Sequence, residues 1–172
     1  MSFDDDDFAL FGVPMRQRQD RAALDARWRA LQAEVHPDRF AAEGAAARRV
    51  AMQWSVRVNE AYQRLKDPLR RAAHLCELRG APVDAERNTA MPADFLVRQM
   101  QWREALDDAH GAADVQALDD ALRAERDALY VTLERTLDDD GDAVAAAAQV
   151  RALMFVERLR GDIDRRLEAA GH

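Results

Sequence analysis

Apolar side chains recur at helical spacing over the first half of the chain, in two stripes separated by a short polar segment. The first stripe consists of Leu24, Trp28, Leu31 and Val35. The second stripe consists of Ala47, Val50, Trp54, Val58, Ala61 and Leu65. Such spacing places the side chains of each stripe on one face of a helix. The pattern predicts one helix from the N-cap residue Asp20 to Val35, and a second from Ala45 to Lys66.

The segment His36-Pro37-Asp38 lies between these two helices. Pro37 cannot continue the first helix, and it biases His36 toward an extended backbone. We therefore expect an antiparallel helical hairpin whose connecting loop runs to Gly44 and carries a charged tip. An ordinary proline-containing turn is the alternative interpretation of the three residues taken alone.

The rest of the chain is also patterned as helix. Asp67-Pro68 ends the second helix, and a shorter one is expected over residues 68–79, with Gly80 at its end. Its inward residues are predicted to be Ala72, Leu75, Cys76 and Leu78. A linker over 81–91 then leads to helices over 92–109, 113–138 and 142–170. Short turns between them make neighbours antiparallel, which predicts a three-helix bundle.

Apolar spacing in the last two helices supports this bundle. The residues concerned are Leu118, Leu122, Leu129 and Leu133, followed by Val156, Leu159, Ile163 and Leu167. No alternating strand pattern flanked by turn residues occurs in the sequence. The fold class is therefore predicted to be all-α.

Two acidic runs invite a metal interpretation. The first, Asp4 to Asp7, is interpreted as part of a disordered, solvated tail over residues 1–7, because adjacent carboxylates do not converge on an ion without a scaffold. In the second, Asp138 to Asp142, a calcium loop would need Gly at its sixth position and Glu at its twelfth. Gly141 is fourth and Gln149 is twelfth. We predict a turn joining two helices, and no metal site.

The formal net charge of −7 is unevenly distributed. Up to Arg87, 15 Lys and Arg stand against 14 Asp and Glu, whereas the remainder has 10 against 18. A more basic module joined to an acidic one suggests two different protein partners, and argues against nucleic acid as the main ligand.

Cys76 is the sole cysteine, so no disulfide framework exists. With no signal peptide or apolar run of membrane length, we expect a bacterial cytoplasmic protein that does not enter the membrane.

The order helix, His-Pro-Asp, helix, with Asn59-Glu60-Ala61-Tyr62 near the end of the second helix, resembles the J domain of DnaJ-type co-chaperones. The opening from Asp7 to Pro14 resembles the segment before the first long helix of that family. Further along, residues 68–75 and 95–100 resemble the HscB family, J proteins dedicated to iron–sulfur cluster assembly. The resemblance implies a J domain over 1–80, a linker over 81–91 and a client-binding bundle over 92–172.

In such proteins the loop formed here by His36, Pro37 and Asp38 contacts an ATP-bound 70-kDa heat-shock chaperone, of the HscA type for the HscB family, and triggers its ATP hydrolysis. Basic residues around the motif assist. The candidates here are Arg27, Arg29 and Arg39. Ala30 and Glu34 stand where general DnaJ proteins often have basic residues, so the basic surface is thinner. Exposed arginines that serve only solubility are the alternative interpretation.

The first helix of the predicted bundle holds a second candidate site. In the HscB family a matching strip binds the IscU-type scaffold on which clusters are built. Its residues here would be Leu96, Val97, Met100, Gln101, Glu104, Asp108 and, from the last helix, Phe155. Gln101 replaces a common Glu, and Asp108 shortens another. Spacing alone equally allows a competing assignment, in which Leu96 and Met100 are core residues.

That competing assignment turns on which side of the helix faces inward. The residues that would face inward if the strip is exposed are Phe95, Gln99, Trp102 and Leu106.

The sequence offers no set of catalytic residues. Its four histidines are scattered, and no glycine-rich phosphate loop or nucleophile–base set is present. We expect a co-chaperone without a cofactor, not an enzyme. The alternatives are a J protein for another client, and a helical interaction protein whose His-Pro-Asp motif is vestigial.

Overall fold

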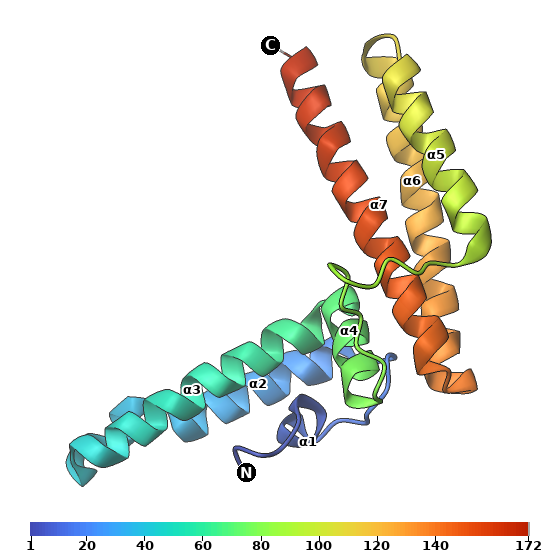
Figure 1. Ribbon diagram of the computed structural model, residues 1–172. Helices are drawn as coiled ribbons and strands as arrows, with labels where there is room; N and C mark the ends of the chain where they lie inside the picture. Colours follow the sequence, from blue (N-terminus) through green and yellow to red (C-terminus); the bar gives the residue numbers. More distant parts are fainter. Residues whose placement is uncertain (172) are drawn as a thin grey trace. The chain divides into compact units, whose positions relative to one another are not determined.

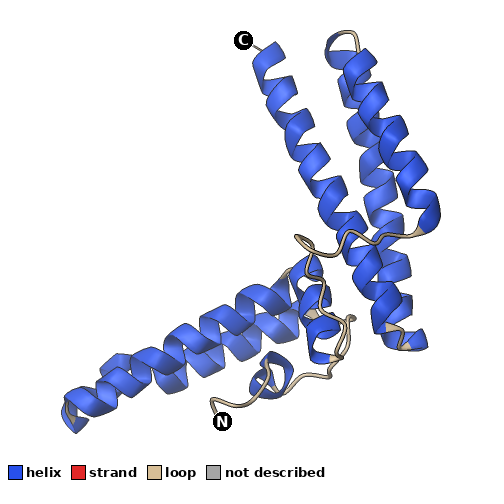
Figure 2. Ribbon diagram, in the orientation of Figure 1, coloured by secondary structure: helices blue, strands red, loops and turns tan. Residues whose placement is uncertain are grey.

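The protein is described by a computed structural model that covers residues 1–171 (Figure 1). Its helices are α1 (Asp7–Phe11), α2 (Arg21–Val35), η1 (Pro37–Glu43), α3 (Ala45–Lys66), α4 (Pro68–Leu78), α5 (Ala93–Asp108), α6 (Gly111–Arg135), η2 (Thr136–Asp140) and α7 (Ala143–Ala170). Every regular element within 1–171 is a helix, so the all-α prediction is confirmed (Figure 2). The bounds of the long helices agree with the predicted ones to within two residues, except that α6 ends at Arg135, three residues before the predicted end at residue 138.

The chain divides into two compact units, Met1–Leu75 and a second that begins at Cys76. The division falls inside α4, a few residues before the domain limit at residue 80 that the sequence suggests. Each unit has its own set of buried apolar side chains. A stretch without helix follows α4 and leads to α5, where the linker is expected.

In the first unit, α2 and α3 lie side by side as an antiparallel hairpin (Figure 1). The buried residues of this interface are Leu24, Leu31 and Val35 from α2, with Ala51, Val58, Ala61 and Leu65 from α3. The predicted inward position of Val50 is wrong, because this side chain is exposed and Ala51 is buried instead. Both residues are apolar, and only the rotation of α3 against α2 decides between them.

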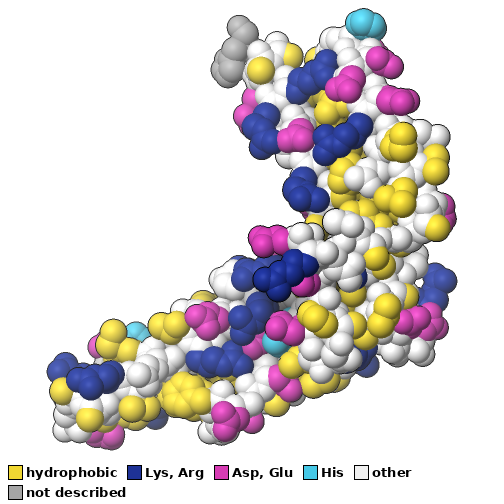
Figure 3. Space-filling model, viewed as in Figure 1, with side chains coloured by type: hydrophobic (Ala, Val, Ile, Leu, Met, Phe, Trp, Pro, Cys, Tyr) yellow, Lys and Arg dark blue, Asp and Glu magenta, His cyan; other side chains and the backbone are white. Residues whose placement is uncertain are grey.

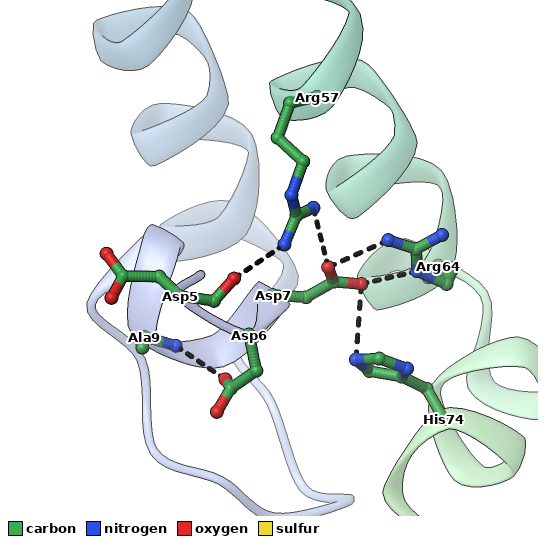
Figure 4. A network of polar contacts seen from close by, with 7 residues as sticks. All are labelled: Asp5, Asp6, Asp7, Ala9, Arg57, Arg64 and His74. Carbon is green, nitrogen blue, oxygen red and sulfur yellow. Dashed lines mark hydrogen bonds and ion pairs between the residues drawn. The ribbon is translucent and has the colours of Figure 1, made fainter. Parts of the chain in front are cut away.

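The prediction of a disordered acidic tail is also wrong. Asp6 caps α1 by accepting a hydrogen bond from the backbone N–H of Ala9 at 2.9 Å. Asp7 is 1% exposed at its side chain and pairs with Arg57 and Arg64 of α3 (Figure 4). A run of four aspartates suggests solvation, but one of them faces two arginines that lie 50 and more residues away in the chain.

The N-cap predicted for α2 is present, and the predicted inward residues of α4 are buried with one exception. The Asp20 carboxylate accepts hydrogen bonds from the backbone N–H groups of Ala22 and Ala23, which caps α2. In α4, the predicted inward residues Ala72, Leu75 and Cys76 are buried, whereas Leu78 is exposed, against the prediction. Leu78 is the last residue of α4, so the turn that would continue its inward face is missing.

The second unit contains α5, α6 and α7, with α6 and α7 in the most extensive contact. Its largest fully buried side chains include Phe95, Leu122, Leu133, Leu153 and Leu159. The acidic run after α6 lies in and just after the short π-helix η2, which follows directly on α6. The Asp142 carboxylate then caps α7 by accepting a hydrogen bond from the backbone N–H of Ala145 at 3.0 Å. The run therefore joins two helices, as predicted. Within residues 1–171 no cluster of three or more side chains suited to a metal ion is found.

Candidate functional site

The His-Pro-Asp tip lies at the end of the hairpin, with His36 between α2 and η1 and with Pro37 and Asp38 as the first residues of η1. His36 ends α2 with φ −59° and ψ 130°, the extended conformation expected before proline. Its Nδ1 accepts a hydrogen bond from the backbone N–H of Asp38 at 3.2 Å. The Asp38 side chain is 92% exposed. The loop continues as the 3₁₀ helix η1 rather than as an irregular segment, and Pro37 is its first residue.

This hydrogen bond determines what the tip can offer a partner. Because Nδ1 accepts this hydrogen bond, the neutral form of the His36 imidazole carries its proton on Nε2. The tip then presents one imidazole donor and, on Asp38, one carboxylate acceptor, on a backbone held by Pro37. The residues have a donor and an acceptor for recognition, and no nucleophile activated by a base.

A polar network beneath the tip joins the two helices of the hairpin. The Gln32 amide donates to Asn59 Oδ1 at 2.8 Å, and Ser55 Oγ donates to Gln32 Oε1 at 3.0 Å. The Trp28 indole N–H also donates to Asn59 Oδ1, at 3.0 Å. Sequence reasoning missed Gln32 and Ser55, although Gln32 lies one turn before His36 on α2. The network fixes the spacing of α2 and α3 close to the loop that they carry.

The three candidate arginines have different environments. Arg27 is partly buried, and its Nε donates to the backbone carbonyl of Phe11 at 3.2 Å. Arg29 is exposed on α2. Arg39 is exposed too, and its Nη1 donates to the carbonyl of Ala33 in the last turn of α2 at 3.2 Å. Arg29 and Arg39 are therefore accessible to a partner, while Arg27 supports the junction between α1 and α2.

An acidic residue on α2 weakens the positive charge of this helix. The hydrogen bond from the Tyr62 hydroxyl, and then that from Arg21, lowers the pKa of Asp25 below its ordinary value of 3.8. The same hydrogen bond raises the pKa of the Tyr62 phenol. Asp25 thus stays ionised at neutral pH, close enough to Arg29 to interact with it electrostatically. The basic surface of the hairpin is limited, as the sequence suggests.

The candidate strip on α5 is exposed. Leu96, Val97 and Met100 have 52%, 58% and 67% of their surface exposed. Yellow apolar atoms gather over α5 in Figure 3. The polar members Gln101, Glu104 and Asp108 are exposed as well. The opposite face of α5 turns inward, with Phe95 fully buried and Gln99, Trp102 and Leu106 half-buried. The structure thus decides between the two assignments in favour of the exposed strip.

Phe155 does not share this exposure, so its placement with the strip needs correction. It is 3% exposed on α7, and its ring meets that of Phe95 edge to face at 5.9 Å between centroids. The Arg103 guanidinium lies 5.2 Å from the centroid of the same ring. The Phe155 ring is therefore a core side chain, covered by Arg103, in the unbound protein.

Two arginines hold α5 in place within the second unit. Arg98 pairs with Glu125 of α6, and Arg166 of α7 donates to the backbone carbonyls of Leu106 and Ala109. The latter contacts satisfy carbonyls at the end of α5, where intrahelical partners are missing. Sequence reasoning did not identify either contact, since both join residues far apart in the chain. The strip is thus carried on a helix that contacts with both α6 and α7 hold in place.

Across residues 1–171, none of the helices has the length and apolar character needed to cross a lipid bilayer.

The comparisons with known proteins all indicate the same family. The family model described as the HSCB C-terminal oligomerisation domain matches residues 91–164. The chain is 51% identical over 170 residues to the "Co-chaperone protein HscB homolog" of Burkholderia multivorans, covering 98% of this chain and 97% of that protein. The protein of the same description from Burkholderia mallei is also 51% identical, over 175 residues, covering 100% and 99%.

Solved structures agree with these relatives. The chaperone HscB from Vibrio cholerae is 34% identical with a TM-score of 0.79, covering 96% of this chain and 99% of that chain. The human co-chaperone protein HscB has the same fold, with a TM-score of 0.86 at 24% identity, covering 96% of this chain and 84% of that one. Since about half of all positions are identical to bacterial relatives over the full length, the chain belongs to the HscB family of co-chaperones, which are not enzymes and combine an N-terminal J domain with a C-terminal helical bundle.

Proposed function

We propose that this protein stimulates the ATPase of an HscA-type 70-kDa chaperone through its J domain and delivers an IscU-type scaffold to that chaperone through its bundle, during iron–sulfur cluster assembly in the bacterial cytoplasm. Binding both partners raises the effective concentration of one near the other. The family membership supports a chaperone partner and a client in general.

The exposed apolar side chains of the strip carry the client half of this proposal. Leu96, Val97 and Met100 lie together on one face of a helix in an acidic bundle, although burying them would stabilise it. Apolar groups exposed next to each other are typical of a protein-binding surface. Glu104 and Asp108 extend the strip with negative charge, which favours a client with basic residues near its apolar contact.

The geometry of the tip supports the chaperone half. His36, Pro37 and Asp38 are held by a short hydrogen-bonded turn above a braced helical hairpin, and Asp38 is nearly fully exposed. Arg29 and Arg39 add positive charge on the adjacent surface. A rigid tip loses little conformational entropy on binding, so few contacts suffice for recognition.

The client half is tested by calorimetric titration with the IscU-type scaffold of the same organism. Truncating Leu96 and Met100 together to alanine should raise the dissociation constant about 100-fold, because each buried side chain of this size contributes about 1–2 kcal/mol. Val131→Ala is the matched control, since Val131 is an equally exposed apolar residue on α6. If the folded wild-type protein does not bind the scaffold, the client is a different protein and this half of the proposal is wrong.

The chaperone half is tested by measuring the steady-state ATPase of the HscA-type chaperone. His36→Gln should abolish the stimulation while leaving the melting temperature and scaffold binding unchanged, because His36 is exposed. His110→Gln, at an exposed histidine of the second unit, is the control. Equal stimulation by His36→Gln and wild type would favour the alternative of a vestigial motif.

A further inference from the structure

A groove of about 600 Å³ runs between α5 and α7 of the second unit. Its lining includes Gln99, Arg103, Phe155, Arg158, Asp162 and Arg165. Arg103 lies three residues after Met100 on α5, so the two side chains are neighbours on the helix surface. The groove therefore borders the apolar strip along one edge.

Arg103 lies over the aromatic ring at the base of the groove and covers part of it. Its guanidinium lies 5.2 Å from the centroid of the Phe155 ring, and this ring is 3% exposed. Arg103 itself is exposed to solvent, and a cation over an aromatic ring at such an exposed site is held only weakly. A competing anion can therefore draw the guanidinium away at small cost, and the ring beneath would then be open to contact.

The charge of the groove favours such an anion. Two carboxylates also line the groove: Asp162, which is paired with Arg165, and Glu157, which lies 3.9 Å from Arg160. Arg160 is itself paired with Asp119 at 3.2 Å. Among residues 1–171, Arg103 and Arg158 make no ion pair. Two uncompensated guanidinium groups thus flank the groove, in a part of the chain where acidic residues outnumber basic ones by 18 to 10 from Asn88 onward.

We propose that this groove binds an acidic side chain of the scaffold client, and that Arg103 acts as a gate over Phe155. In the free protein the gate is closed. When the client covers the strip, a carboxylate placed next to one of its apolar residues pairs with Arg103 and Arg158, and the apolar residue reaches the uncovered Phe155 ring. This inference rests on the proposed function, because it assigns a second contact to the same client.

The proposal explains how a buried phenylalanine can belong to a binding surface. It also gives the client a charge pattern, with basic groups facing Glu104 and Asp108 at one end of the strip and an acidic group at the groove beside it. Charges of opposite sign on the two sides of an apolar contact fix the orientation of a bound partner. The free bundle keeps its aromatic ring out of water until the client arrives.

The first test measures scaffold affinity by calorimetry for wild type, Arg158→Gln and the control Arg87→Gln. Both substitutions remove one positive charge from an exposed arginine, and Arg87 lies in the linker outside the groove. We expect Arg158→Gln to raise the dissociation constant about five- to tenfold, the loss of one charge-assisted contact, with no change for Arg87→Gln. Equal affinities of Arg158→Gln and the control would overturn the inference while leaving the proposed function intact.

The second test observes the gate directly, by fluorine NMR of a single 4-fluorophenylalanine in place of Phe155. We expect its resonance to shift when Arg103→Gln removes the cation above the ring, and to shift in the wild-type background on saturation with scaffold. An unchanged resonance at saturation, with binding verified by calorimetry, contradicts the gate. Sodium glutamate at matched ionic strength serves as the comparison, and an equal shift with it would indicate an anion site unrelated to the client. No scaffold binding at all would instead refute the proposed function.

Discussion

Asp7 of α1 and Arg57 of α3 are joined by an ion pair of 2.8 Å, although 50 residues separate them in the chain. Arg64 shares the same carboxylate, and His74 Nε2 lies 3.5 Å from it (Figure 4). A buried carboxylate is strongly unfavourable unless cations and hydrogen-bond donors surround it. The pairing therefore attaches α1 to α3 and links the start of the chain to the stability of the whole first unit.

Asp7→Asn should destabilise the first unit by about 2 kcal/mol, because it leaves two arginines without their anion at a site that is nearly closed to water. The figure is below that of a fully buried pair since Arg57 and Arg64 keep part of their surface in solvent. Urea unfolding followed by far-UV circular dichroism measures the change. Asp4→Asn, which alters the same acidic run at an exposed position, should leave the unfolding curve unchanged.

The same carboxylate predicts how stability depends on pH. Burial by itself raises the pKa of Asp7, but hydrogen bonds from Arg64 and Arg57 outweigh burial, so the pKa lies below the ordinary value of 3.8. A folded-state pKa below the unfolded value means that the ionised group stabilises the fold above about pH 4, and that this contribution is lost as the pH falls through the folded-state pKa. The melting temperature of the wild type should therefore fall more steeply on acidification than that of Asp7→Asn, and parallel curves would contradict this assignment.

Most limits of the long helices could be predicted from the sequence because their signals are local. The Asp20 side chain caps the start of α2 through neighbouring backbone N–H groups, and Pro37 prevents α2 from continuing. Neither effect depends on tertiary contacts. The position of the His-Pro-Asp tip follows from these two limits alone. The fold class and the outline of the first candidate site therefore needed no knowledge of packing.

Other features depend on contacts between distant segments and could not be predicted. Val50 and Ala51 are both compatible with an inward face, and the rotation of α3 selects Ala51. The burial of Asp7 depends on arginines in another helix. On α5, apolar residues occur on two faces, so only the packing against α6 and α7 shows that Leu96 and Met100 are exposed. In the same way, only this packing shows that Phe155 of α7 is buried.

Cys76 should be chemically inert in the folded protein. Its thiol is buried, and burial raises its pKa to about 11, so almost no thiolate exists at neutral pH. We expect no reaction with Ellman's reagent at pH 8 in native buffer and full reaction of one thiol per chain in denaturing urea. Rapid labelling of the native protein would show that the end of α4 opens readily. A Cys76→Ser variant supplies the blank for the measurement.

Phe155→Ala and the double truncation of Leu96 and Met100 should separate folding from binding. Phe155 fills the core against Phe95, so its truncation should cost about 3 kcal/mol of unfolding free energy. Leu96 and Met100 are exposed, and their truncation should change the stability by less than about 0.5 kcal/mol. Denaturant unfolding followed through Trp102, which lies in the same bundle and meets the Phe95 ring at 5.5 Å, measures both effects.

The contrast decides how binding data on this surface are to be interpreted. Loss of scaffold binding by a variant that includes Phe155→Ala can result from a loosened bundle, whereas loss by the double variant with an unchanged unfolding midpoint can only come from the surface. Phe155→Leu offers an intermediate case, because it keeps most of the core volume but removes the ring. If Phe155→Leu retains its stability and still loses affinity, the ring itself contributes to client binding, as expected when Arg103 moves aside.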